Sequence, residues 1–197
     1  PVRTNAVFAQ MMEIGIRAIP IVALLSATIG VMLAIQGIHT LRTFGAESRV
    51  VVGISLSVVR EFSALITGIL VAGRSGSALA ARLSTMQINQ EIDALRVMGI
   101  HPVRYLVVPS LIAMMVMLPS LTFLSDLVAL YAAGIFVSLD LGISQAAYWS
   151  QTIEILSVGD LWHGLGKASI FAVLITLIGI VNGASVTGGA EGVGKVT

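Results

Sequence analysis

The sequence predicts an all-α integral membrane protein, because apolar residues are abundant and charged residues gather in short segments between charge-free runs. Apolar residues make up 56% of the chain and charged residues 11%, with a mean hydropathy of +0.98. Soluble proteins average about 45–50% apolar and about 25% charged residues. The net charge of +1 and the lack of cysteine favour neither nucleic-acid binding nor disulfides nor a cysteine metal site.

Four apolar runs are each long enough to cross a hydrocarbon core of about 30 Å as a helix. We expect spans at residues 20–41, 50–72, 106–139 and 168–190. Residues 1–19 mix apolar and charged side chains, which is typical of a helix lying at the membrane interface. Pro109 and Pro119 should kink the third span without breaking it. The sequence thus predicts one transmembrane domain over residues 1–197.

Basic residues predict the orientation, because they are enriched in short cytoplasmic loops. If residues 85–105 are cytoplasmic, that side also holds most of the basic side chains: Arg3, Arg17, Arg74, Arg82, Arg96, Arg104 and Lys195. The opposite side then holds Arg42, Arg49 and residues 140–160, which carry three acids and no base.

Residues 85–105 form a polar segment between two apolar runs and predict a short amphipathic helix at 86–99. One face carries Ile88, Ile92 and Leu95, and the other carries Gln90, Glu91, Asp93 and Arg96. Asn89 or Thr85 can cap its start, and Gly99 offers a left-handed stop. Such a helix contacts either lipid headgroups or a protein, and its acidic residues disfavour an anionic leaflet.

Arg60 and Glu61 lie at the middle of the second predicted span, where unpaired charges are costly. Neighbouring residues point about 100° apart on a helix, so each needs a partner elsewhere. Lys167 and Asp126 are the available opposite charges. A polar site in a substrate pathway and a structural ion-pair network both explain the pair, and intramembrane charges favour the pathway.

Two short motifs suggest other chemistry, and a third pattern favours helix packing. Residues 189–196 approach a phosphate-binding loop, but Val196 replaces the hydroxyl that binds the metal. Residues 73–76 match a G-x-S-G serine-protease motif with Ser75 as nucleophile, which requires a histidine base at the same depth. The small residues Gly73, Gly76, Ser77 and Ala80 instead favour close helix packing. No residues have the spacing of metal ligands.

Several blocks in order along the chain resemble the MlaE-type permease subunits of bacterial ABC transporters that move phospholipids with MCE-domain proteins. The blocks are Val59–Phe62, Leu70–Ala78, Glu91–Gly99, Pro102–Pro109 and Gly188–Gly194. They cover essentially the whole chain. The family usually has Arg-Glu-Leu-Gly-Pro where this chain has residues 60–64 without Gly-Pro, so we expect a weaker helix irregularity there. The family usually has Glu in place of Arg82.

The resemblance implies a homodimer with a lipid cavity between the copies, and a fifth span after residue 197, so we expect the chain to be C-terminally incomplete. It implies that the cavity is lined by Leu33, Thr40, Leu41, Phe44, Arg60, Glu61 and Lys167. It also implies that residues 86–99 are a coupling helix seated in a cytosolic ATPase subunit through Ile88, Glu91, Ile92, Asp93, Leu95, Arg96 and Met98.

The function implied is that of a non-catalytic, multi-pass permease subunit in the inner membrane of a Gram-negative bacterium. The partners implied are a cytosolic ABC ATPase, which binds the ATP and Mg, a periplasmic MCE-domain protein, a small STAS-domain protein and phospholipid. This chain itself should bind no metal, cofactor or nucleic acid. The alternatives are an intramembrane serine hydrolase that uses Ser75, and an ion-driven carrier.

Overall fold

The computed structural model describes residues 4–186, and all regular structure in that range is helical. Within the range, four stretches are long and apolar enough to cross a membrane: Thr4–Arg42, Glu47–Ile88, Val103–Leu141 and Val158–Ala184. The predicted all-α membrane class is therefore confirmed. Arg3, Lys195, the end of the last predicted span and the motif at 189–196 lie outside the described residues.

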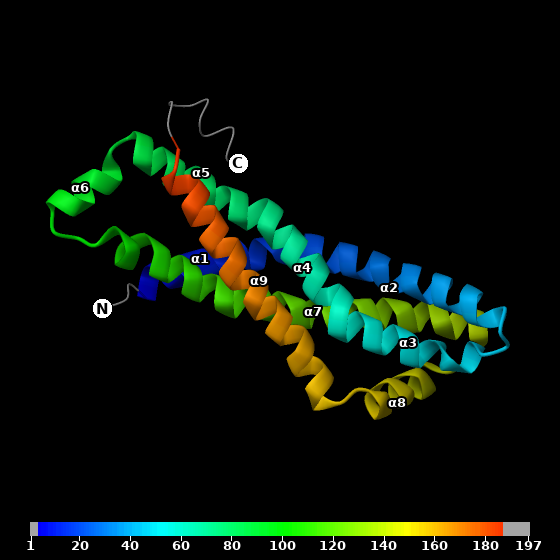
Figure 1. The fold of residues 1–197 in the computed structure, drawn as a ribbon. Helices are drawn as coiled ribbons and strands as arrows, with labels where there is room; N and C mark the ends of the chain where they lie inside the picture. The colour runs from blue at the N-terminus through cyan, green and yellow to red at the C-terminus, as the bar shows by residue number, and fades with distance from the viewer. Residues whose placement is uncertain (1–3, 187–197) are drawn as a thin grey trace. The chain divides into compact units, whose positions relative to one another are not determined.

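Nine α-helices are labelled in Figure 1 over the described range. They are α1 (Thr4–Ile14), α2 (Ile19–Arg42), α3 (Val50–Ser57), α4 (Ser63–Val71), α5 (Ser77–Ile88), α6 (Glu91–Val97), α7 (Val108–Leu141), α8 (Gln145–Ile155) and α9 (Val158–Ala184). Shorter 3-10 turns occupy Ile16–Ala18 and Glu47–Arg49, and π-helical turns occupy Val58–Phe62, Ala72–Gly76 and Val103–Val107. Helix α7 continues through Pro119, so this proline does not break the helix.

The last long helix begins earlier than the sequence predicts. Helix α9 starts at Val158, whereas the charge of Lys167 places the predicted span after that residue. Ser157 and Asp160 fix the start: the Asp160 carboxylate accepts from the Ser157 amide and hydroxyl at 2.9 and 2.7 Å, and the Asp160 amide donates back to the Ser157 hydroxyl at 3.3 Å. This reciprocal pattern is a capping box, which satisfies amides that a helix start leaves unpaired.

The chain divides into two compact units. Unit 1 contains the residues up to Ala18, residues 68–118 and the residues from Ser169 onward; unit 2 contains residues 19–67 and 119–168. Helices α4, α7 and α9 each contribute residues to both units.

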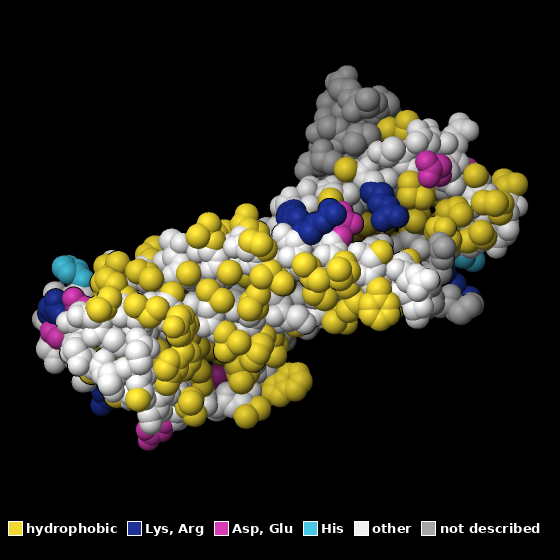
Figure 2. Space-filling model, turned by 180° about the vertical axis from the view of Figure 1, so that it is seen from behind, with side chains coloured by type: hydrophobic (Ala, Val, Ile, Leu, Met, Phe, Trp, Pro, Cys, Tyr) yellow, Lys and Arg dark blue, Asp and Glu magenta, His cyan; other side chains and the backbone are white. Residues whose placement is uncertain are grey.

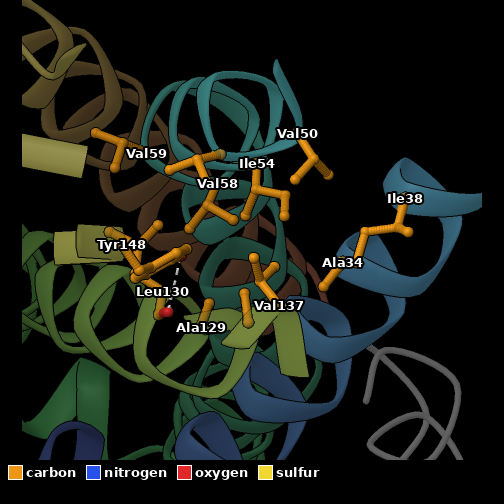
Figure 3. Close-up of a cluster of buried hydrophobic side chains, with 12 residues drawn as sticks. Ala34, Ile38, Val50, Ile54, Val58, Val59, Ala129, Leu130, Val137 and Tyr148 are labelled. Carbon is orange, nitrogen blue, oxygen red and sulfur yellow. Dashed lines mark hydrogen bonds between the residues drawn. The ribbon is translucent and has the colours of Figure 1, made fainter. Parts of the chain in front are cut away.

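The core of unit 2 lies between α2, α3, α7 and α8 (Figure 3). Small and β-branched side chains fill it, including Ala34, Val58 and Val137, together with the ring of Tyr148. The Tyr148 hydroxyl donates to the Leu130 carbonyl at 3.0 Å, so the buried phenol is satisfied. Buried hydroxyl pairs also join helices here: Ser26 with Ser125 at 2.6 Å, and Thr67 with Thr122 at 2.7 Å.

Unit 1 is held together by close approach of α9 to α5. A Cβ added at Gly179 would lie 3.1 Å from the Gly76 carbonyl oxygen, and one added at Gly183 would lie 2.8 Å from the Ala80 carbonyl oxygen. Small residues allow helix backbones to approach this closely. Figure 1 shows α6 at one end of this unit, joined to α5 before it and to the start of α7 after it.

Residues 58–62 form a π-helical turn, so the helix is irregular at this position although the Gly-Pro pair is absent. A π turn carries one extra residue and is common at functional sites. Here it contains Arg60 and Glu61 and is braced from outside: a Cβ at Gly164 of α9 would overlap the carbonyl oxygen of Val59. The π turn therefore packs tightly against α9, and it forms without a Gly-Pro pair in its own sequence.

Candidate functional site

Arg60 and Glu61 both find partners on α9. The Lys167 ammonium lies 2.5 Å from the Glu61 carboxylate and donates to the carbonyl oxygen of Arg60 at 3.1 Å. The Arg60 guanidinium lies 3.6 Å from the second carboxylate oxygen of Asp160. These four residues of unit 2, Arg60, Glu61, Asp160 and Lys167, are called the charged cluster below.

The charged cluster corrects one sequence prediction and adds a residue that the sequence reading missed. Asp126 was the expected partner for Arg60, but its side chain is buried and makes no ion pair within the described residues. The prediction failed because α9 starts before Lys167 and brings Asp160 to the π turn. The Ser157-x-x-Asp160 pattern was the available signal, since a capping box before an apolar run marks a helix start.

The charged cluster is open rather than sealed in the core. The side chain of Glu61 is 61% exposed and that of Arg60 is 45% exposed, although Asp160 is only 16% exposed. Exposed charges in helices that cross a membrane require water, a polar ligand or another chain. The cluster can therefore offer both an ammonium and a guanidinium to an anion.

The other expected cavity residues lie elsewhere in unit 2. Leu33, Thr40 and Leu41 line a cavity of about 300 Å³ between α2 and α3 that continues to Ser57, directly before the π turn. Phe44 is 78% exposed in the connection after α2 and does not line this cavity. The expected cavity residues thus fall into two groups. One group lines the apolar cavity, the other belongs to the charged cluster, and Phe44 belongs to neither.

Helix α6 covers the central part of the expected coupling helix. Ile92 and Leu95 are buried, whereas Glu91, Asp93 and Arg96 are exposed, with Arg96 paired to Asp93 at 2.9 Å. Ile88 ends α5 instead of belonging to α6. The apolar stripe therefore faces the chain itself, and it holds α6 in place.

The ends of α6 differ from one another in how well the sequence predicts them. Gly99 has a φ of +73°, with the Ile100 amide donating to the Leu95 carbonyl and the Gly99 amide to the Arg96 carbonyl, both as expected for a glycine stop. The start is different, because left-handed Gln90 (φ 59°) precedes the helix without a side-chain cap. The capping role predicted for Asn89 or Thr85 is wrong: Asn89 donates to the Glu91 carboxylate and Thr85 to the Ala81 carbonyl.

Apolar side chains at the end of α6 and just after it are available to a partner. Val97 is 89% exposed and Met98 is 64% exposed, and Ile100 and Val103 add to the same end of unit 1. Figure 2 shows a mainly hydrophobic surface over this end, with a few charged side chains at its edges. Val97, Met98, Ile100 and Val103 are called the α6 apolar surface below.

The family model described as Permease MlaE matches residues 7–197. This chain belongs to the MlaE permease family. It is 32% identical over 200 residues to a probable ABC transporter permease protein of Rickettsia typhi, covering 100% of this chain and 76% of the relative.

Two further relatives carry more specific names. The Haemophilus influenzae protein is an intermembrane phospholipid transport system permease protein, MlaE, and is 31% identical over 190 residues, which are 95% of this chain and 72% of the relative. The chloroplastic protein Trigalactosyldiacylglycerol 1 of Arabidopsis thaliana is 33% identical over 188 residues, 95% of this chain and 54% of the relative. The MlaE permease family thus accounts for nearly the entire chain.

In this MlaE-family chain, the expected helix-packing residues do not all behave alike. Gly76 and Ala80 are buried and present their carbonyl oxygens to Gly179 and Gly183 of α9. Ser77 donates its hydroxyl back to the Gly73 carbonyl at 2.6 Å. Gly73 has open space where a Cβ would lie, so it makes no close contact of this kind.

Ser75, the nucleophile of the hydrolase alternative, lines a cavity of about 190 Å³ in unit 1. The described residues around that cavity include no histidine. A serine nucleophile needs a base within hydrogen-bond reach. The geometry around Ser75 therefore gives the hydrolase alternative no support.

Potential metal ligands are also dispersed in the structure. No group of three or more occurs within residues 4–186.

Proposed function

We propose that this chain is the membrane-spanning, non-catalytic subunit of an ABC transporter that moves phospholipid between a bacterial inner membrane and a periplasmic MCE-domain partner. Membership of the MlaE permease family and the name of the Haemophilus relative support this function. In this proposal a separate cytosolic subunit binds ATP and Mg and hydrolyses the ATP. The working unit is a homodimer in the inner membrane of a Gram-negative bacterium, with a small STAS-domain protein as a further partner.

The observation that carries the proposal is the open charged cluster beside an apolar cavity in unit 2. Lys167 and Arg60 offer cations to a lipid phosphate, while the cavity lined by Leu33, Thr40 and Leu41 offers apolar surface to acyl chains. A charge that is partly exposed within a spanning helix is stabilised by such a ligand or by water. The cluster suits the polar part of an amphipathic substrate.

The α6 apolar surface supports a contact with the ATPase subunit. Val97 and Met98 lie outside the apolar spans, next to the exposed charges of Asp93 and Arg96. Exposed apolar side chains surrounded by polar ones are typical of protein interfaces. Ile92 and Leu95 are buried and α6 contacts α5, so a force exerted on α6 by the ATPase subunit would reach α5.

Reconstituted vesicles containing the permease and its ATPase test this function through ATP-dependent transfer of fluorescent phospholipid. Glu61→Gln should strongly reduce transfer, because it removes one charge of the cluster while keeping its shape. Glu154→Gln is the matched control: it makes the same chemical change at an exposed site on α8. Equal transfer by both variants would refute the proposed role of the cluster.

The same preparation separates the alternatives. Lipid transfer without the ATPase subunit would favour an ion-driven carrier. Covalent labelling of Ser75 by a serine-reactive phosphonate would favour the hydrolase. The permease proposal expects neither result.

A further inference from the structure

We propose that the cavity around Arg74 and Arg82 in unit 1 is a second headgroup site, which binds a phosphate ester carrying a primary amine. The cavity lies among α1, α5 and α7 and has a volume of about 190 Å³. It shares no residue with the charged cluster or with the cavity between α2 and α3. The inference depends on the chain lying in a phospholipid membrane, and it does not depend on how transport is coupled to ATP.

The cavity gathers charges that do not pair with one another. Arg74 and Arg82 line it together with Glu13 of α1. Within the described part of the chain, no ion pair joins Glu13 to either arginine. Opposite charges that line one cavity without pairing with each other are suited to a ligand that carries both signs.

The charge pattern defines the ligand. A guanidinium binds a phosphate through a planar fork of N–H donors, and two arginines can hold one phosphate between them. The Glu13 carboxylate can only accept hydrogen bonds when ionised, so it suits the N–H donors of a primary ammonium group. A phosphoethanolamine group matches both requirements, whereas a purely anionic group would meet repulsion from Glu13.

The size and the remaining lining indicate a headgroup attached to a lipid. Sites for drug-sized ligands are usually about 300–1,000 Å³, so this cavity holds a headgroup and not a whole phospholipid. Gln10, Ser75 and Ser110 add polar groups, while Ile14, Leu79 and Met114 supply apolar wall. The basic residues of this cavity belong to the side predicted to be cytoplasmic, where the headgroups of that leaflet lie.

Photo-crosslinking in nanodiscs tests the site without nucleotide or transport. The permease complex is placed in phosphatidylcholine nanodiscs that contain a photoactivatable phosphatidylethanolamine or phosphatidylglycerol with the same acyl chains. Crosslinked peptides are then quantified by mass spectrometry. The proposal expects phosphatidylethanolamine to label peptides from α1 and α5 more strongly than phosphatidylglycerol does.

Three substitutions and one control test which residues form the site. Arg74→Gln and Arg82→Gln should each reduce labelling by both lipids about tenfold, the scale expected for a lost hydrogen bond to a charged group. Glu13→Gln should remove the preference for phosphatidylethanolamine while labelling persists. Arg104→Gln makes the same change as the arginine variants at an exposed residue outside the cavity and should leave labelling unchanged.

Several results would overturn the proposal. Equal labelling in wild type and in the Arg82→Gln variant would exclude the site. If Arg104→Gln reduced labelling as much as Arg82→Gln does, the labelling would reflect a general attraction of the lipids to basic residues. Competition with soluble O-phosphoethanolamine distinguishes a lipid headgroup from a soluble ester as the source of the bound phosphoethanolamine group. If the soluble ester removes all labelling at the concentration of the lipid itself, the ligand is a soluble phosphate ester, and the lipid form of the proposal fails. Failure of transport with intact labelling would count against the proposed function alone.

Discussion

Asp160 joins Ser157 and Arg60 through different oxygens of one carboxylate. One oxygen accepts both hydrogen bonds from Ser157, at 2.9 Å from the amide and 2.7 Å from the hydroxyl, while the other lies 3.6 Å from the Arg60 guanidinium. The residue that starts α9 is therefore also the residue that orients an arginine of the charged cluster. Local helix capping and the proposed substrate site are coupled in this one side chain.

Asp160→Asn separates these two roles. The amide oxygen of asparagine can still accept from Ser157, so α9 should keep its start and the thermal unfolding temperature should stay close to that of wild type. The charge facing Arg60 is lost, and ATP-dependent lipid transfer should fall several-fold. Asp140→Asn is the control. Asp140 lies 2.9 Å from the Arg42 guanidinium, and neither residue belongs to the charged cluster. Unchanged transfer in the Asp160→Asn variant would contradict the role of Asp160 in the site.

Lys167 contacts both Glu61 and the backbone of the π turn, so its replacement should be among the most severe in the charged cluster. Lys167→Met keeps the length of the stem but leaves Glu61 and the Arg60 carbonyl without their donor. Transfer should be strongly but still measurably reduced in Lys167→Met and less reduced in Lys167→Arg. The Glu61→Gln, Lys167→Met double variant should be no worse than the worse single one, since interacting residues are not additive. Additive losses in this transfer assay would mean that the two residues act independently.

Val97→Asp tests the α6 apolar surface. Val97 is 89% exposed, so a charge there should leave the permease folded but weaken copurification of the ATPase subunit and uncouple ATP hydrolysis from lipid transfer. Leu139→Asp places the same charge at a residue that is 80% exposed at the end of α7 and should spare copurification. Leu95→Asp is a different kind of change because Leu95 is buried, and it should lower the unfolding temperature. Normal coupling in the Val97→Asp variant would exclude Val97 from the interface.

The sequence predicts the elements whose signals are local. Long charge-free runs locate the helices that can span a membrane, and Gly99 locates the end of α6 because a left-handed residue is needed there. The sequence does not reveal the partner of Arg60, since that depends on which turn of α9 packs against the π turn. It also does not reveal the left-handed Gln90 before α6, which is a conformation that non-glycine residues adopt rarely.

The sequence also does not reveal the partners of Arg42. Arg42 counts against the predicted orientation, but it pairs with Glu47 at 3.3 Å and with Asp140 at 2.9 Å. Composition alone could count this residue but could not show that it is paired.

Tyr148 gives unit 2 a pH dependence that a single substitution should remove. Burial raises the pKa of its hydroxyl from 10.0 to about 12, so the folded state favours the neutral phenol. Its contribution to stability is complete below pH 10, where the phenol is neutral in both states, and it is lost as the pH rises through about 12. Tyr148→Phe should cost about 1 kcal/mol at neutral pH through the lost bond to Leu130. The difference in unfolding temperature between the two proteins should then shrink above pH 10; a constant difference would contradict this account.

Gly183 and Gly73 provide a matched test of helix packing in unit 1. A Cβ at Gly183 would lie 2.8 Å from the Ala80 carbonyl oxygen and 2.7 Å from the Leu83 Cβ, whereas a Cβ at Gly73 would meet nothing within 4 Å. Backbone and Cβ atoms cannot move aside as a flexible side chain can, so Gly183→Ala should force α9 away from α5. Overpacking of this kind costs about 1–3 kcal/mol, and the unfolding temperature should fall. Gly73→Ala should unfold at or above the wild-type temperature, because alanine favours a helix over glycine by about 1 kcal/mol. Equal effects of the two substitutions would show that the small residues at these positions reflect composition and not contact between the helices.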